Sequence, residues 1–165
     1  MTSARQALVL ALACICGFSV SPATANGLLD LATRDLAETR TVTGITLVFD
    51  PGKIVMVYAL PGKTRTITNV VGLAGGAQEI DEPADTLLER LDLKSYFIRL
   101  TLPDGVPVWV KAFAVSFFRA TEPWDHTPAE ARSSVNAGPR PIFVRETVSV
   151  IKDAINTVRR QNREP

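Results

Sequence analysis

Cysteine and histidine are scarce in this sequence. Both cysteines, Cys14 and Cys16, lie before Ala25, and His126 is the sole histidine of the 165-residue chain. A chain that loses the segment ending at Ala25 has no disulfide and must be held together by its hydrophobic core. A single histidine excludes metal sites built from several histidines and leaves one imidazole for acid–base chemistry.

The sequence also has no hydrophobic run long enough to cross a membrane. An uncharged apolar stretch, Ala7 to about Phe18, covers about 12 residues, whereas a transmembrane helix needs about 20. Arg5 precedes this stretch, and Pro22 and then Ala23-Thr24-Ala25 follow it. This order is typical of a secretory signal peptide with small residues before the cleavage site. We therefore predict cleavage after Ala25, a periplasmic or secreted chain, and no permanent transmembrane anchor.

Two other fates of the leader stay open. In the first alternative, the segment is retained as an uncleaved anchor. In the second, a lipid is attached at Cys14 or Cys16. A lipoprotein signal has a branched apolar residue three places before the modified cysteine, and those places here hold Ala11 and Ala13. The pattern favours removal of the leader over lipidation.

An excess of positive charge is absent as well. Of the 18 Lys and Arg residues only Arg5 lies in the leader, which leaves 17 cations against 17 acids. Nucleic-acid binding normally requires a basic face, so we expect no nucleic-acid partner. The roughly 140 remaining residues are enough for one ordinary domain or for two small units packed together.

The remaining chain predicts an α+β fold of two similar units. In each unit, alternating apolar residues and turns such as Pro103-Asp104-Gly105 predict an antiparallel β-meander, and an apolar stripe at helical spacing predicts a helix after it. The predicted segments are a signal peptide (1–25), an N-terminal helix and linker (26–42), a first β-β-β-α unit (43–92), a second β-β-β-α unit (96–158) and a flexible basic tail (159–165).

Residue spacing supports an internal repeat. One set of matched positions keeps a constant offset in sequence number: Ile54, Val57 and Ala59 with Val115, Phe118 and Ala120. A second set keeps its own, slightly larger offset: Ile80, Glu82, Leu87 and Leu91 with Val144, Glu146, Ile151 and Ile155. We interpret this as a diverged duplication, and the alternative is a chance match between two small α+β stretches. The aromatic residues expected in a shared core are Trp109, Phe117 and Phe143.

The second unit also resembles a known family. The residues concerned are Ile98-Arg99-Leu100-Thr101-Leu102-Pro103-Asp104-Gly105, Val110-Lys111-Ala112, Val115, Val144-Arg145-Glu146 and Val150-Ile151. This part, about residues 97–156, resembles the short flagellar FlbD-type proteins, which share a Leu-Thr-x-x-Asp/Asn-Gly opening and a Val-x-Glu before a terminal helix. The resemblance implies a small non-catalytic β-rich module. It implies no role in motility, because that family has no signal peptide and works inside the cell.

The candidate functional residues lie in one loop. Trp124, Asp125 and His126 stand between prolines in the longer loop of the second unit, with Glu122 and Glu130 nearby. A displayed tryptophan in an inserted loop is typical of a contact site. The alternatives are a solvated surface loop, or acid–base or zinc chemistry by the imidazole and its carboxylates.

Other polar clusters have structural explanations. The stretch Gly72–Gly76 has no Lys-Ser/Thr of a phosphate loop and is predicted to be a turn. Glu82 and Glu146 precede the two predicted helices and are predicted to cap them rather than to catalyse. The cations of the tail suit the negative end of the last helix dipole, and contact with acidic lipid or with a partner is the alternative.

These features together favour a non-catalytic binding or accessory module of the bacterial cell envelope. We expect it to act by contact with an envelope protein and to need no cofactor or metal. The first alternative is a small periplasmic hydrolase that uses His126 with Asp125 or Glu130. The second is a carrier of a lipid or small ligand, which requires a sizeable apolar cavity between the two units.

Overall fold

The computed structural model describes residues 35–60, 67–73 and 76–162. The predicted leader and most of the predicted N-terminal helix lie outside these residues. The first half contains strands β1 (Ala37–Arg40), β2 (Thr46–Phe49), β3 (Met56–Ala59), β4 (Thr68–Leu73) and β5 (Gly76–Ile80), followed by helix α2 (Ala84–Arg90). The second half contains β6 (Phe97–Thr101), β7 (Pro107–Lys111), β8 (Phe117–Ala120), β9 (Ser133–Asn136) and β10 (Ile142–Val144), followed by α3 (Val148–Gln161). The predicted α+β class is confirmed.

A five-stranded antiparallel sheet joins the two halves of the chain. Its strand order is β5-β4-β3-β7-β6, so β3 of the first half pairs with β7 of the second. In this junction Met56 lies opposite Val110 and Val57 lies opposite Trp109. The halves are therefore connected by a β-ladder as well as by side-chain packing.

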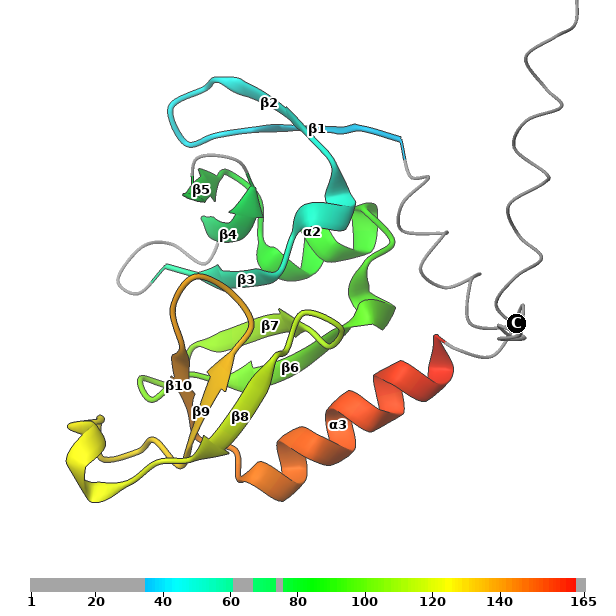
Figure 1. Cartoon of the computed structure of the whole chain (residues 1–165). Helices are drawn as coiled ribbons and strands as arrows, with labels where there is room; N and C mark the ends of the chain where they lie inside the picture. The colour runs from blue at the N-terminus through cyan, green and yellow to red at the C-terminus, as the bar shows by residue number, and fades with distance from the viewer. Residues whose placement is uncertain (1–34, 61–66, 74–75, 163–165) are drawn as a thin grey trace, which may run out of the picture.

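Two smaller sheets flank the central one (Figure 1). The β1–β2 hairpin meets β5 through an antiparallel bridge between Thr41 and Ile80. The sheet β10-β9-β8 meets β6 where the Arg145 N–H donates to the Thr101 carbonyl at 2.9 Å. Each half thus curls into a hairpin and a three-stranded meander around its own interior.

Each half has a hydrophobic core closed by its own helix. Leu87 and Leu88 of α2 are fully buried in the first core, together with Val57 and Ile80. Three residues of α3 close the second core: Ile151, Ile155 and Val158. Both cores include residues of the five-stranded sheet. Because a short helix is only marginally stable by itself in water, the packing of these buried faces stabilises both helices.

The two hairpins have the same register. Ala37 lies opposite Phe49 in β1–β2, and Ile98 lies opposite Val110 in β6–β7. Ile98 follows Ala37 by as many residues as Val110 follows Phe49. The same separation relates the residues of the first matched set in the sequence. The two turns also match, because both contain a glycine with positive φ, Gly44 at 81° and then the glycine of the predicted Asp-Gly turn at 88°.

The two meanders also correspond closely. Thr68 lies opposite Ile80 in β4–β5, and Ser133 lies opposite Val144 in β9–β10. Strand order is also the same, β5-β4-β3 in one half and β10-β9-β8 in the other. The element order hairpin, meander, helix therefore occurs in both halves.

Several local features differ from the sequence predictions, which gave each unit three strands where each half of the structure has five. Strand β1 lies within the segment predicted as helix and linker (26–42). Strand β9 begins directly after the long loop of the second unit, and no strand was predicted at Ser133–Asn136. Helix α3 continues to Gln161 and so includes the first residues of the predicted flexible tail. The Arg159 guanidinium donates to the Ala112 carbonyl at 3.0 Å, which ties this helix end to the strand region.

The aromatic core prediction is right at one position and wrong at another. Trp109 is buried at 8% exposure, and Phe143 is half-buried. Phe117 is 53% exposed, although its apolar side chain and strand context predicted burial. It lies on β8, which pairs with β9 alone among the described strands, and its side chain belongs to neither hydrophobic core.

Candidate functional site

The predicted contact loop contains a short 3₁₀ turn, η3 (Pro123–Asp125). Glu122 caps this turn, and its backbone N–H donates to the Asp125 carboxylate at 2.7 Å. The Glu122 side chain accepts in return from the last backbone N–H of the turn. This reciprocal capping box fixes the loop at the point where the chain leaves β8.

An ion pair holds the same turn to the strand before it. The Arg119 guanidinium donates to both carboxylate oxygens of Asp125, at 2.8 and 2.6 Å. These bonds, with the one from the Glu122 N–H, hold the pKa of Asp125 below its ordinary value. A paired, bidentate carboxylate that stays ionised acts as an anchor for the loop.

The anchored turn displays Trp124. This side chain is 69% exposed, the largest exposed fraction among the large hydrophobic side chains of the described residues. His126 follows it in the left-handed region with φ of 49° and is also exposed. The structure thus brings the three predicted residues together in one turn, with separate roles: Asp125 positions the turn, and the two rings face solvent. Such an arrangement suits contact with another molecule.

The geometry gives less support to chemistry at this loop. Both Asp125 oxygens are used in the ion pair with Arg119, so this carboxylate already has a partner other than the His126 imidazole. Within residues 35–60, 67–73 and 76–162, no group of three or more His, Cys, Asp or Glu side chains is placed to hold a metal ion.

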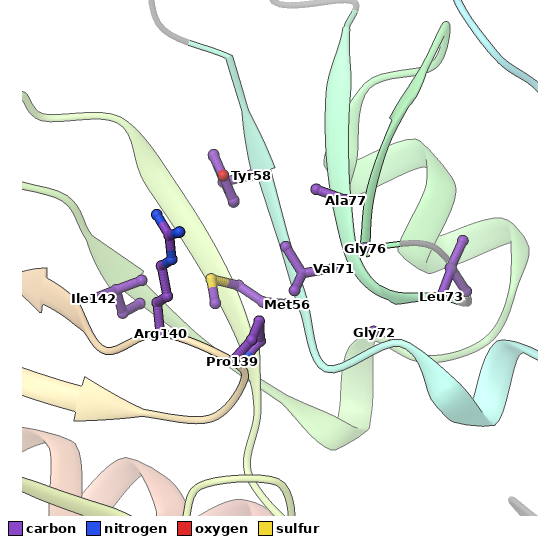
Figure 2. A pocket seen from close by; sticks show the side chains of 10 residues that line it. All are labelled: Met56, Tyr58, Val71, Gly72, Leu73, Gly76, Ala77, Pro139, Arg140 and Ile142. Atoms are coloured by element: carbon purple, nitrogen blue, oxygen red, sulfur yellow. The ribbon is translucent and has the colours of Figure 1, made fainter.

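A second candidate site is an apolar groove of about 430 Å³ between the two halves. Figure 2 shows Arg140 on one side, Ala77 on the other, and Met56 and Val71 between them. The lining residues come from β3, β4, β5 and the connection into β10: Met56, Tyr58, Val71, Gly72, Leu73, Gly76, Ala77, Pro139, Arg140 and Ile142. Arg140 is the one ionised side chain among them.

Sequence reasoning did not find these groove residues. They carry no common motif, and they come from both halves of the chain. The tertiary fold brings the segment around Pro139 next to β3 and the β4–β5 hairpin.

The two predicted cap residues act differently from the prediction. Glu82 pairs with Arg90 at 2.7 Å, and α2 has no side-chain cap. Glu146 accepts from the Thr101 backbone N–H at 3.0 Å, and α3 has no side-chain cap. The capping prediction is therefore wrong, because each carboxylate lies one residue before the N-cap and reaches a tertiary partner instead. Both roles are structural.

No helix among the described residues is long and apolar enough to span a membrane. In comparisons with protein-family models, with curated proteins and with solved structures, the chain has no match. The resemblance of the second unit to FlbD-type proteins therefore stays a prediction.

Proposed function

We propose that this protein is an exported, non-catalytic binding module of the bacterial cell envelope that acts by protein–protein contact through the loop around Trp124. The observation that carries the proposal is an exposed indole on a turn whose backbone is fixed twice, by a capping box and by the bidentate Arg119–Asp125 pair. A preformed loop loses little conformational freedom on binding, and tryptophan is enriched among residues that dominate protein interfaces.

Capture of a partner from an envelope fraction tests this proposal. We expect Trp124→Ala to reduce recovery of the partner by about tenfold or more, a loss typical of a hot-spot residue. Val150→Ala is the matched control, because Val150 is 51% exposed on α3, outside the loop. Added wild-type protein should compete for the captured partner and the Trp124→Ala variant should not.

The intact mass of the exported chain, measured on the same material, reports whether it begins at Asn26 and carries a lipid. Equal capture by Trp124→Ala and wild type would rule out the loop as the contact site. Turnover of a substrate that disappears in His126→Ala would instead favour the hydrolase alternative.

The groove supports a second candidate function, carriage of a small amphipathic ligand. Its lining is mainly apolar, and the one cation, Arg140, lies at its side, which suits a short acyl chain with a carboxylate. This is the kind of cavity between the two halves that a carrier requires.

Displacement of a fluorescent fatty acid by decanoate tests the carrier function. We expect Ala77→Trp to abolish binding by filling the groove, since Ala77 is an exposed lining residue. Arg140→Gln should weaken decanoate about tenfold and leave decanol unchanged, because only the carboxylate needs the cation. Wild-type protein that binds neither compound would exclude this function.

We also infer that the two halves descend from one duplicated unit. Three observations support this: the shared element order, the shared hairpin register, and two fully buried hydroxyl residues, Thr68 opposite Ile80 and Ser133 opposite Val144. Buried hydroxyls at the same point of two strands are not required by hydrophobic patterning.

A further inference from the structure

The junction between the halves leaves an equivalent unfilled edge at each end of the molecule. Inside the chain, the third strand of the first half, β3, pairs with the second strand of the second half, β7. By element order, the counterpart of β3 is β8 and the counterpart of β7 is β2. Among the described strands, β8 pairs with β9 alone and β2 pairs with β1 alone.

Each of these two edges carries an apolar side chain that is about half exposed, and β8 also carries Arg119, which is paired with Asp125. Met56 of β3 is 3% exposed because it faces the core of the second half, whereas its counterpart Phe117 is 53% exposed. Trp109 of β7 is 8% exposed because it faces the core of the first half, whereas its counterpart Val48 is 53% exposed. Phe117 and Val48 are thus exposed at the positions where their counterparts, Met56 and Trp109, are buried by the β3–β7 junction.

Natural proteins usually protect an open strand edge with charge, proline or a covering segment. Here the two edges carry large apolar side chains at the positions that the β3–β7 contact would seal. The same two kinds of strand already pair within the chain, as β3 with β7. By analogy with this internal pairing, the edge that matches either one is the other edge of a second copy.

We propose that copies of this chain associate head to tail, with β8 of one copy paired antiparallel to β2 of the next in the register of β3 with β7. Val57 opposite Trp109 predicts Phe118 opposite Val48 of the next copy, and Met56 opposite Val110 predicts Phe117 opposite Phe49 of the next copy. The contact is heterologous, so it extends into a short filament or closes into a ring of several copies.

Sedimentation of the purified exported chain over a range of concentrations tests the association. We expect wild-type protein to form oligomers larger than dimers, because each copy has both edges. Phe117→Glu and Val48→Glu should each remain monomeric, with affinity reduced by about tenfold or more. An equimolar mixture of the two variants should form a dimer and nothing larger. The Phe117→Glu chain keeps only an intact β2 edge and the Val48→Glu chain keeps only an intact β8 edge, so one contact is possible.

The same measurement includes its controls. Val150→Glu places a charge on the exposed face of α3 and should leave the oligomers unchanged. Thermal melts show whether each variant is folded, and Phe117→Thr and Val48→Thr replace the glutamates if either fails to fold. Wild type that stays monomeric at about 1 mM, or oligomers that persist in both edge variants, would overturn the proposal.

Disulfide trapping checks the register. A chain with Val48→Cys mixed with a chain with Phe118→Cys should give a covalent dimer on mild oxidation. Val48→Cys mixed with Ala120→Cys, two positions out of register on the same face, should give at least about fivefold less, because directly opposed Cβ atoms are about 5 Å apart and diagonal ones about 7 Å. Equal trapping of both pairs would contradict the register.

Discussion

Gly72 shows at the scale of one residue why β4 tolerates no side chain where it passes the segment just before β3. Its φ is +110°, and a Cβ at this position would clash with the Lys53 carbonyl oxygen and lie 2.9 Å from the Val55 backbone nitrogen. Both clashing groups are backbone, and Val55 holds β4 through a 2.9 Å bond from its N–H to the Val71 carbonyl. Neither can move without opening the ladder.

We expect Gly72→Ala to lower the free energy of unfolding by about 2–4 kcal/mol, because it combines positive φ with a backbone clash. Urea denaturation measures this loss. Gly76→Ala is the matched control: its φ is +102°, but nothing lies within 4 Å of the added Cβ, so about 1 kcal/mol is expected. Equal losses for the two variants would mean that backbone conformation alone sets the requirement.

Burial of single aromatic residues was only partly predictable from the sequence. Trp109 and Phe117 both stand in apolar strands, and both were expected in the core. Trp109 is covered because its side chain packs in the core of the first half, whereas Phe117 belongs to neither core. Hydrophobicity indicates which side chains gain by burial, but strand order decides which of them are covered.

At the scale of elements, the η3 turn depends on the ionisation of Asp125. Because its folded pKa is below the ordinary value, the ion pair stabilises the turn at pH values above the unfolded pKa, about 3.9. That contribution is lost as pH falls through the lower, folded pKa. The turn that displays Trp124 should therefore be ordered throughout the neutral range.

We expect Arg119→Gln to raise the pKa of Asp125 toward its ordinary value, because the guanidinium is the main cause of the shift. Carboxylate titration by NMR measures this directly. Arg132→Gln is the control, since it removes a nearby exposed cation that does not bond to Asp125. An unchanged pKa in Arg119→Gln would show that the Glu122 N–H alone sets the value.

Elements with a clear hydrophobic period were predictable, and β9 was not. The apolar stripe of α3 predicted a helix, and the structure has one from Val148 to Gln161. Strand β9 reads Ser-Ser-Val-Asn, a composition typical of a loop, yet Ser133 and Ser134 are buried. It is a strand because β8 and β10 satisfy its backbone from both sides, and a single-sequence pattern does not contain that information.

At the scale of the whole molecule, the β3–β7 ladder should make the two halves unfold together. Leu88 and Ile151 are matched probes, one fully buried in each core. We expect Leu88→Ala and Ile151→Ala each to cost about 2–5 kcal/mol and to shift one shared thermal transition. Calorimetry measures this. Two transitions, of which each variant moves only its own, would mean that the halves fold independently.

The sequence by itself determined the α+β class, the antiparallel meanders and the helix after each of them, because period and turn chemistry are local properties. It also placed Trp124, Asp125 and His126 in one loop, since they are neighbours in the chain. Only the tertiary structure decided that β3 pairs with β7, that a groove forms between the halves, and which apolar residues stay uncovered on β2 and β8. Those outcomes depend on which distant strand edges meet, and strand pairing is set by the packing of the whole chain rather than by any one segment.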